Sequence, residues 1–78
     1  MSSLEAIENE VTRRYANALS SYQAARARAD RLDAETHGVA ARQAEEMRRH
    51  ADADLEEDRA RADAWAQTER QRLASARS

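Results

Sequence analysis

The chain contains no proline and a single glycine, and 52 of its 78 residues belong to the six types with the highest helix propensity (Ala, Arg, Glu, Gln, Leu and Met). Since Gly38 is the one residue of very low helix propensity, nearly the whole chain is expected to be helical, and the fold class is predicted to be all-α. A capping box formed by Ser2 as N-cap and Glu5 at N3 predicts a helix start at Ser3 or Leu4.

Apolar residues recur every seven positions through the first half of the chain. Ile7 joins this pattern at its start, where Glu8 interrupts one of its rows. The two rows consist of Leu4, Val11, Ala18, Ala25, Leu32 and Val39, and of Tyr15, Tyr22, Ala29 and Thr36. Two rows at this spacing are typical of the a and d positions of a coiled coil, so the pattern predicts a first helix over 3–37 with a heptad seam. Such a stripe requires cover from another helix.

The second half of the chain keeps an apolar stripe but changes its interval to eleven residues. Two rows show this interval: Ala44, Leu55 and Ala66, and Ala51, Ala62 and Leu73. Met47 begins a third row that continues with acidic residues, and Trp65 lies one turn beyond Ala62. An eleven-residue interval favours a nearly straight or right-handed seam, so we expect a second helix over 40–76 with a narrow contact surface.

Gly38 and its neighbour His37 separate the two patterns almost at the midpoint of the chain. We expect a turn over 37–39, with Gly38 in the left-handed conformation at C′ and Val39 packing back on Leu32. This turn predicts a two-helix hairpin that assembles as a coiled coil or bundle. The alternative is one long continuous coiled-coil helix, because no usual N-cap residue follows Gly38 and glycine within a helix costs only about 1 kcal/mol.

Charge and hydropathy indicate which partners to expect. The 13 arginines and 15 acidic residues are mixed along the chain and leave a net charge of −2, so no basic surface for nucleic acid is expected. No stretch approaches the roughly 20 apolar residues of a membrane span, and residues 1–10 show no secretion signal, so we expect a cytoplasmic protein or one within a phage particle. The exclusive use of arginine, with abundant alanine, is typical of a GC-rich bacterial or phage genome.

The same composition argues against an enzyme, a cofactor or a metal site. Apart from 19 alanines the chain has only 13 apolar side chains, and it has neither cysteine nor a glycine-rich loop. Glu46, His50 and Asp54 follow one another at four-residue steps, but with 15 carboxylates in the chain this spacing is read as a solvated face. Five acid–arginine pairs at helical spacing are expected to stabilise exposed helix: Glu45–Arg49, Glu46–Arg49, Glu56–Arg59, Glu57–Arg61 and Glu69–Arg72.

These observations predict a non-enzymatic coiled-coil interaction module, self-associating as a homo-oligomer or forming part of a larger assembly such as a virion or scaffold. The alternatives are a regulatory adaptor that docks on a cellular coiled coil and a nucleic-acid-associated helical protein. The aromatic residues are read as core or self-association contacts, with partner docking, in which Leu19 would join, as the alternative. The predicted interaction seam comprises Leu4, Ile7, Val11, Tyr15, Ala18, Tyr22, Ala25, Leu32, Val39, Met47, Leu55, Trp65 and Leu73.

Overall fold

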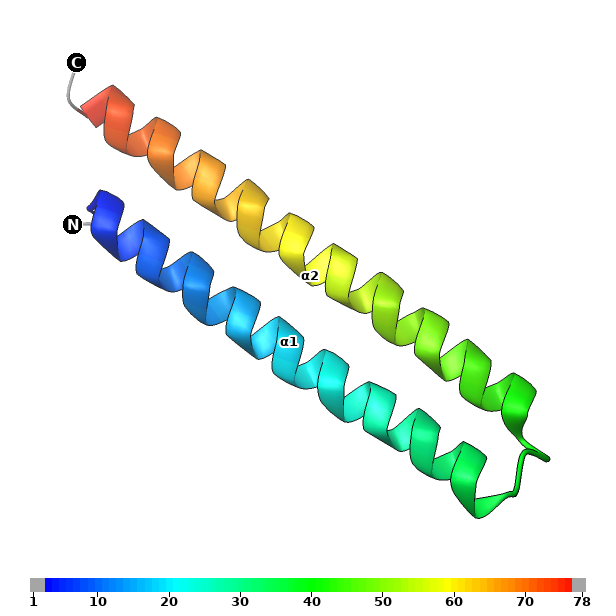
Figure 1. The fold of residues 1–78 in the computed structure, drawn as a ribbon. Helices are drawn as coiled ribbons and strands as arrows, with labels where there is room; N and C mark the ends of the chain where they lie inside the picture. The colour runs from blue at the N-terminus through cyan, green and yellow to red at the C-terminus, as the bar shows by residue number, and fades with distance from the viewer. Residues whose placement is uncertain (1–2, 77–78) are drawn as a thin grey trace.

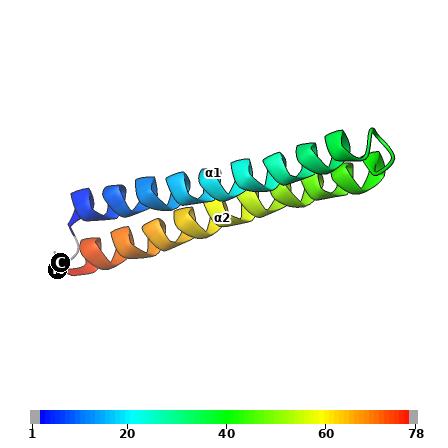
Figure 2. The same ribbon diagram turned by 90° about the horizontal axis from the view of Figure 1, so that it is seen from below.

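A computed structural model describes residues 3–76, which form two long antiparallel helices joined by a short turn (Figure 1). Helix α1 spans Leu4–Glu35 and helix α2 spans Ala41–Ala76. The hairpin measures 62 × 15 × 10 Å, and the start of α1 and the end of α2 lie at the same end of it (Figure 2). The predicted all-α hairpin is therefore confirmed, and the alternative of one continuous helix is wrong.

Helix α1 begins with a capping interaction that differs from the predicted one. Ser3 is the N-cap, in an extended conformation, and its side-chain oxygen accepts a hydrogen bond of 3.1 Å from the amide of Ala6. The N3 position is therefore occupied by alanine, which has no side-chain acceptor for a reciprocal bond, so the predicted capping box is wrong. Ser2, which was predicted to be the cap, lies outside the described residues.

Small side chains form the contact between the helices. Within residues 3–76, the buried residues are Ile7, Ala18 and Ala29 in α1 and Ala44, Ala51, Ala62 and Ala66 in α2. Burial in α1 thus repeats every eleven residues, as predicted for α2, and not every seven. Eleven residues make slightly more than three turns, so a line at this interval drifts by about 20° in eleven residues, whereas a heptad line drifts by about 20° in only seven and in the opposite sense.

Both ends of the predicted heptad row lie outside the contact, because Leu4 is the first residue of α1 and Val39 belongs to the turn beyond the end of α1 at Glu35. Leu4 is 48% exposed and Val39 is 90% exposed. Ile7, which entered the prediction only as a substitute near Glu8, is instead the most buried large side chain, with 1% of its surface exposed.

The turn closes α1 with a Schellman motif that is placed one residue earlier than predicted. Thr36 is the C-cap, and His37 (φ 51°) and Gly38 (φ 84°) both have left-handed backbone conformations. The amide of Gly38 donates to the carbonyl of Asp33 at 3.1 Å, and the amide of His37 donates to the carbonyl of Ala34 at 3.3 Å. His37, and not Gly38, therefore occupies C′, and the exposed Val39 does not pack back on Leu32.

Thr36 also links the two helices through its side chain. Its hydroxyl donates to the carbonyl of Leu32 at 2.7 Å and accepts a hydrogen bond of 3.1 Å from the amide of Ala40, which immediately precedes α2. The sequence has no usual N-cap residue directly after Gly38, and the Thr36 hydroxyl at the end of α1 instead accepts the amide hydrogen bond at the start of α2.

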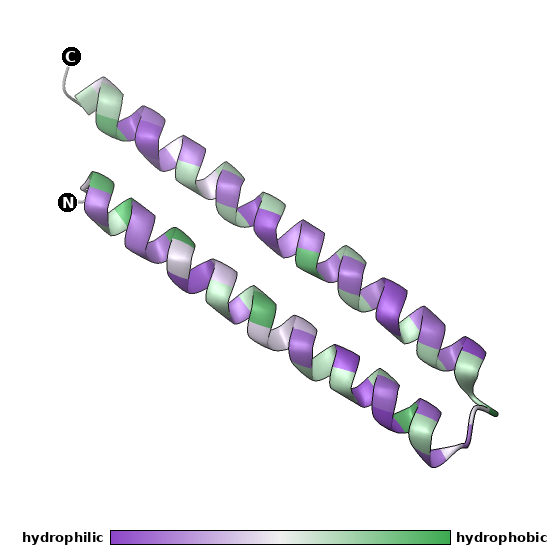
Figure 3. Ribbon diagram, in the orientation of Figure 1, coloured by the Kyte–Doolittle hydropathy of each residue, from purple (hydrophilic) through white to green (hydrophobic). Residues whose placement is uncertain are grey.

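Figure 3 shows that both helices are mainly polar along the ribbon, with apolar positions scattered among the polar ones. Among residues 3–76, no helix combines the length and the apolar character that a membrane crossing requires.

Replacing His37 by glycine is expected to stabilise the hairpin by about 0.5–1 kcal/mol, because glycine adopts a positive φ without steric penalty. Gly38→Ala is expected to cost about 1 kcal/mol through its backbone alone, since no atom lies within 4 Å of a Cβ built there. Urea unfolding followed by circular dichroism measures both effects, with the exposed Val39→Ala as control. A His37→Gly variant no more stable than the parent protein would contradict the turn assignment.

Enlarging a buried alanine is expected to separate the helices. Ala29 has no exposed surface, so Ala29→Leu should destabilise the hairpin by about 1–3 kcal/mol through overpacking. The matched control is Ala27→Leu, an exposed position in the same helix, which should change stability by less than about 0.5 kcal/mol. Thermal unfolding compares the two variants, and a more stable Ala29→Leu protein would contradict the close contact.

Candidate functional site

Polar side chains cross the alanine contact along one side of the hairpin. The Tyr15 hydroxyl donates a hydrogen bond to the Asp63 carboxylate, and the Arg59 guanidinium lies 5.7 Å from the centre of the Tyr15 ring. Further along, Arg26 pairs with Asp52 at 3.6 Å. We call this side the bridged face and define it by the residues of the contacts that link the two helices, which are Tyr15, Arg26, Asp30, Asp33, Arg48, Asp52, Arg59 and Asp63.

Arg48 forms the bridge nearest the turn. Its guanidinium binds the carboxylate of Asp30 at 2.8 Å and lies 3.5 Å from that of Asp33, while its side chain is 22% exposed. The hydrogen bond to Asp30 raises the pKa of Arg48, against an opposing effect of desolvation. Because these bridges join charges on different helices, they determine how α1 and α2 are aligned along their length.

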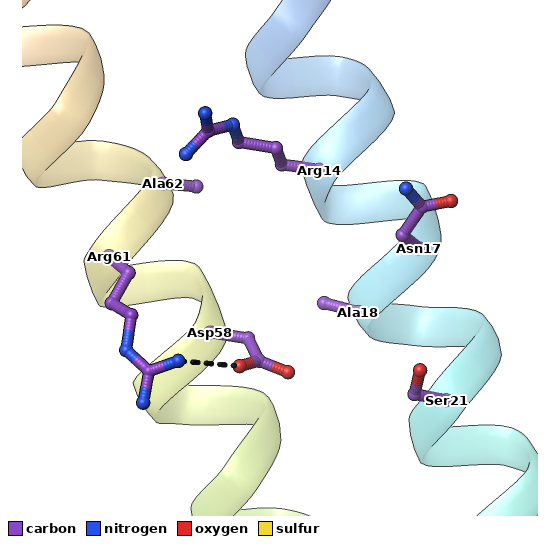
Figure 4. A pocket seen from close by; sticks show the side chains of 7 residues that line it. All are labelled: Arg14, Asn17, Ala18, Ser21, Asp58, Arg61 and Ala62. Carbon is purple, nitrogen blue, oxygen red and sulfur yellow. Dashed lines mark ion pairs between the residues drawn. The ribbon is translucent and has the colours of Figure 1, made fainter.

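The opposite side of the hairpin carries an open groove (Figure 4). It is lined by Arg14, Asn17, Ala18, Ser21, Asp58, Arg61 and Ala62. Asp58 pairs with Arg61 of its own helix at 3.7 Å, and the Arg14 guanidinium lies 4.4 Å from the centre of the Trp65 ring. The Arg14–Trp65 contact is therefore the counterpart, on this side, of the Arg59–Tyr15 contact.

Helical geometry separates the two sides. At about 100° per residue, Arg14 and Ser21 lie on one side of the buried line through Ala18, whereas Tyr15 and Tyr22 lie on the other. Leu4 and Leu19 fall on the same side as Tyr15. Leu19 is 44% exposed, so the bridged face combines charged contacts with accessible leucine side chains.

The structure brings most of the predicted seam to the contact, although to different depths. Ile7 and Ala18 are buried, whereas Leu4 and Val39 are exposed. The half-buried members are Val11, Tyr15, Tyr22, Ala25, Leu32, Met47, Leu55, Trp65 and Leu73. The alanines Ala29, Ala44, Ala51, Ala62 and Ala66 are buried more deeply than these larger side chains. The eleven-residue interval of Ile7, Ala18 and Ala29 was the signal that the heptad interpretation missed.

The predicted pairs within α2 are found in part. Glu57 pairs with Arg61, and Glu69 pairs with Arg72 at 3.2 Å. Glu45 lies 3.8 Å from Arg48 instead of pairing with Arg49, as was predicted. Among residues 3–76, Glu46–Arg49 and Glu56–Arg59 do not form ion pairs, and no His, Asp and Glu side chains gather as a metal site, Glu46, His50 and Asp54 included.

An ion-pair cluster near the start of α1 was not predicted. Glu10 accepts hydrogen bonds from Arg13 at 2.7 Å and from Arg14 at 3.0 Å. These bonds, that from Arg13 first, lower the pKa of Glu10 below its ordinary value of 4.5. Arg14 thus binds Glu10 and also lies over the Trp65 ring, so Glu10 helps to hold the Arg14 guanidinium in place.

Comparison with known proteins identifies no relative: no family model, curated protein or solved structure matches the chain.

The bond between Tyr15 and Asp63 gives the bridged face a measurable pH response. Hydrogen bonding to the Asp63 carboxylate raises the pKa of Tyr15 above its ordinary value of 10.0. Because the pKa is higher in the folded chain, the bond's contribution to stability is complete below pH 10.0 and is lost as the pH rises through the raised pKa.

We expect tyrosinate absorbance to show this shift in a Tyr22→Phe background, where Tyr15 is the only tyrosine. The titration midpoint should lie above 10.0 and move down towards that value when Asp63→Asn is added. Asp52→Asn, on the same helix but bridged to Arg26, is the matched control and should leave the midpoint in place. A midpoint that does not respond to Asp63→Asn would refute the bond.

Proposed function

We propose that this protein is a non-enzymatic helical interaction module that works by binding other helices, foremost those of its own copies, as a small structural or scaffold component. The observation that carries this proposal is the large surface that the hairpin leaves uncovered. Its accessible area is 5932 Å², whereas a compact monomer of 8.8 kDa exposes about 4,800 Å².

The buried side chains point in the same direction. Among the side chains of residues 3–76, Ile7 is the only large one with under 2% of its surface exposed, and the rest of the buried contact consists of alanine. A buried methyl group contributes about 0.8 kcal/mol, compared with about 1.5–3 kcal/mol for a fully buried leucine. Two helices joined by so little apolar area gain substantially from further burial of Leu4 and Leu19, which are about half exposed.

Self-association of this kind is expected to appear in both mass and stability. Light scattering on a size-exclusion column should give at least twice the chain mass of 8.8 kDa at micromolar concentrations. The melting temperature should rise by a few degrees for each tenfold increase in concentration, because dissociation accompanies unfolding. A monomer of 8.8 kDa whose melting temperature is independent of concentration would rule out this function.

A further inference from the structure

The bridged face carries several charges that the hairpin does not pair. Within residues 3–76, the side chains of Glu8, Arg59 and Arg70 form no ion pair, although Arg59 lies over the Tyr15 ring. Helical geometry places all three beside the bridges, with Glu8 next to Ile7 and Arg70 one turn beyond Ala66. Leu19 lies between Tyr15 and Tyr22 on the same face and is 44% exposed.

The bridges also show which levels of the two helices coincide. Tyr15 meets Asp63 and Arg26 meets Asp52, so residue 17 of α1 lies at the level of residue 61 of α2. This level is close to Leu19 and to the cluster of Tyr15, Arg59 and Asp63. Consider a twofold axis that runs across the bridged face at this level, parallel to the face and perpendicular to both helices. This axis would place α1 opposite its copy in the antiparallel direction, and α2 likewise.

We propose that the occupant of the bridged face is a second copy of the chain, related by this twofold axis, so that two hairpins form an antiparallel four-helix bundle. The inference rests on the proposed function and specifies its partner and interface. In α1 the axis places Leu19 opposite the partner's Tyr15 and Glu8 opposite the partner's Arg26. Apolar thus meets apolar at the centre, and opposite charges meet on either side.

The same axis produces complementary charges in α2 without further adjustment. Arg59 lies opposite the partner's Asp63, and Asp52 lies opposite the partner's Arg70. No charges of the same sign face each other at these levels. Charge complementarity in both helices from one axis position is the main argument for a second copy as the occupant.

The competing orientation, with the axis parallel to the helices, matches the charges but not the apolar residues. In that arrangement α1 faces the partner's α2 at the same level, because the bridges align the two helices in this way. Leu19 would then lie against the partner's Arg59. The antiparallel arrangement is favoured because it covers Leu19 with an aromatic ring.

The available area suits such a dimer. The hairpin exposes roughly 1,100 Å² more than a compact chain of its mass, whereas a stable interface buries about 800 Å² on each partner. Burial of a standard interface would therefore bring the exposed area of each chain close to that of a compact protein of its mass.

The orientation is tested by a distance between the two turns. The chain has no cysteine, so a nitroxide on Val39→Cys, at a 90% exposed position, labels each turn once. The antiparallel dimer predicts a label separation of roughly 65 Å, from 22 residues of helix rise on each side of the axis. Turns within roughly 20 Å of each other, about two helix diameters, would overturn the antiparallel arrangement.

The face is tested by substitution, with mass from light scattering as the readout. Leu19→Asp should produce monomers at concentrations where the parent protein is dimeric, while helicity by circular dichroism is retained because Leu19 is exposed. Ala24→Asp, an exposed position on the groove side of the same helix, is the matched control and should remain dimeric. A dimeric Leu19→Asp protein would refute the bridged face as the interface.

A second variant tests the charge pairing. Glu8→Arg should weaken the dimer roughly three- to tenfold, because each dimer contains the altered contact with Arg26 twice. Glu35→Arg makes the same change of charge in the same helix, but its exposed side chain lies on the groove side, in the same direction as Asn17, and it should have little effect. Equal effects of the two variants would overturn the predicted charge pairing. A parent protein that is monomeric at every concentration would refute self-association itself, whereas a dimer with another geometry would refute only this interface.

Discussion

The close contact of alanine side chains along an eleven-residue line is the constraint on which the rest of this structure depends. A methyl group is the largest side chain that lets the helices remain this near over most of a 62 Å length. It also provides little apolar burial for each turn. The hairpin therefore gains specificity of position from its alanines but requires other interactions to fix its alignment.

Those interactions are the bridges at the edge of the contact. Sliding α1 by one turn would bring Arg14 or Tyr22 to the level of Ala18, so the line of small side chains already disfavours such a slip. Arg48 with Asp30, and Tyr15 with Asp63, are each lost by such a slip. Charge and aromatic contacts thus reinforce the alignment that the small side chains favour, a role distinct from adding stability.

The sequence was sufficient to predict the fold class, the hairpin and the position of the turn within one or two residues. Helix propensity and Gly38 act locally, so they can be read without knowledge of the partner helix. The heptad interpretation of α1 failed because Tyr15 and Val11 look like core residues by size, whereas the approach of the second helix selects the smaller Ala29. His37 at C′ was missed since glycine is the usual residue there. The bridge from Arg48 to Asp30 depends on how the two helices are aligned along their length, and the residue pattern within each helix does not specify this alignment.

Alignment of the helices also has a consequence beyond the single chain. Once Tyr15 is held beside Asp63, the Arg59 guanidinium is positioned over the tyrosine ring with no carboxylate of its own among the described residues. The contact that aligns α1 with α2 therefore also orders a cation on the outer surface, next to the exposed Leu19. An ordered charge beside an apolar side chain loses less conformational entropy when a partner covers it. In this hairpin the Tyr15–Asp63 contact therefore has two effects. It aligns two helices whose alanine contact is weak, and it orders the part of the bridged face where burial of Leu19 by a partner is most favourable.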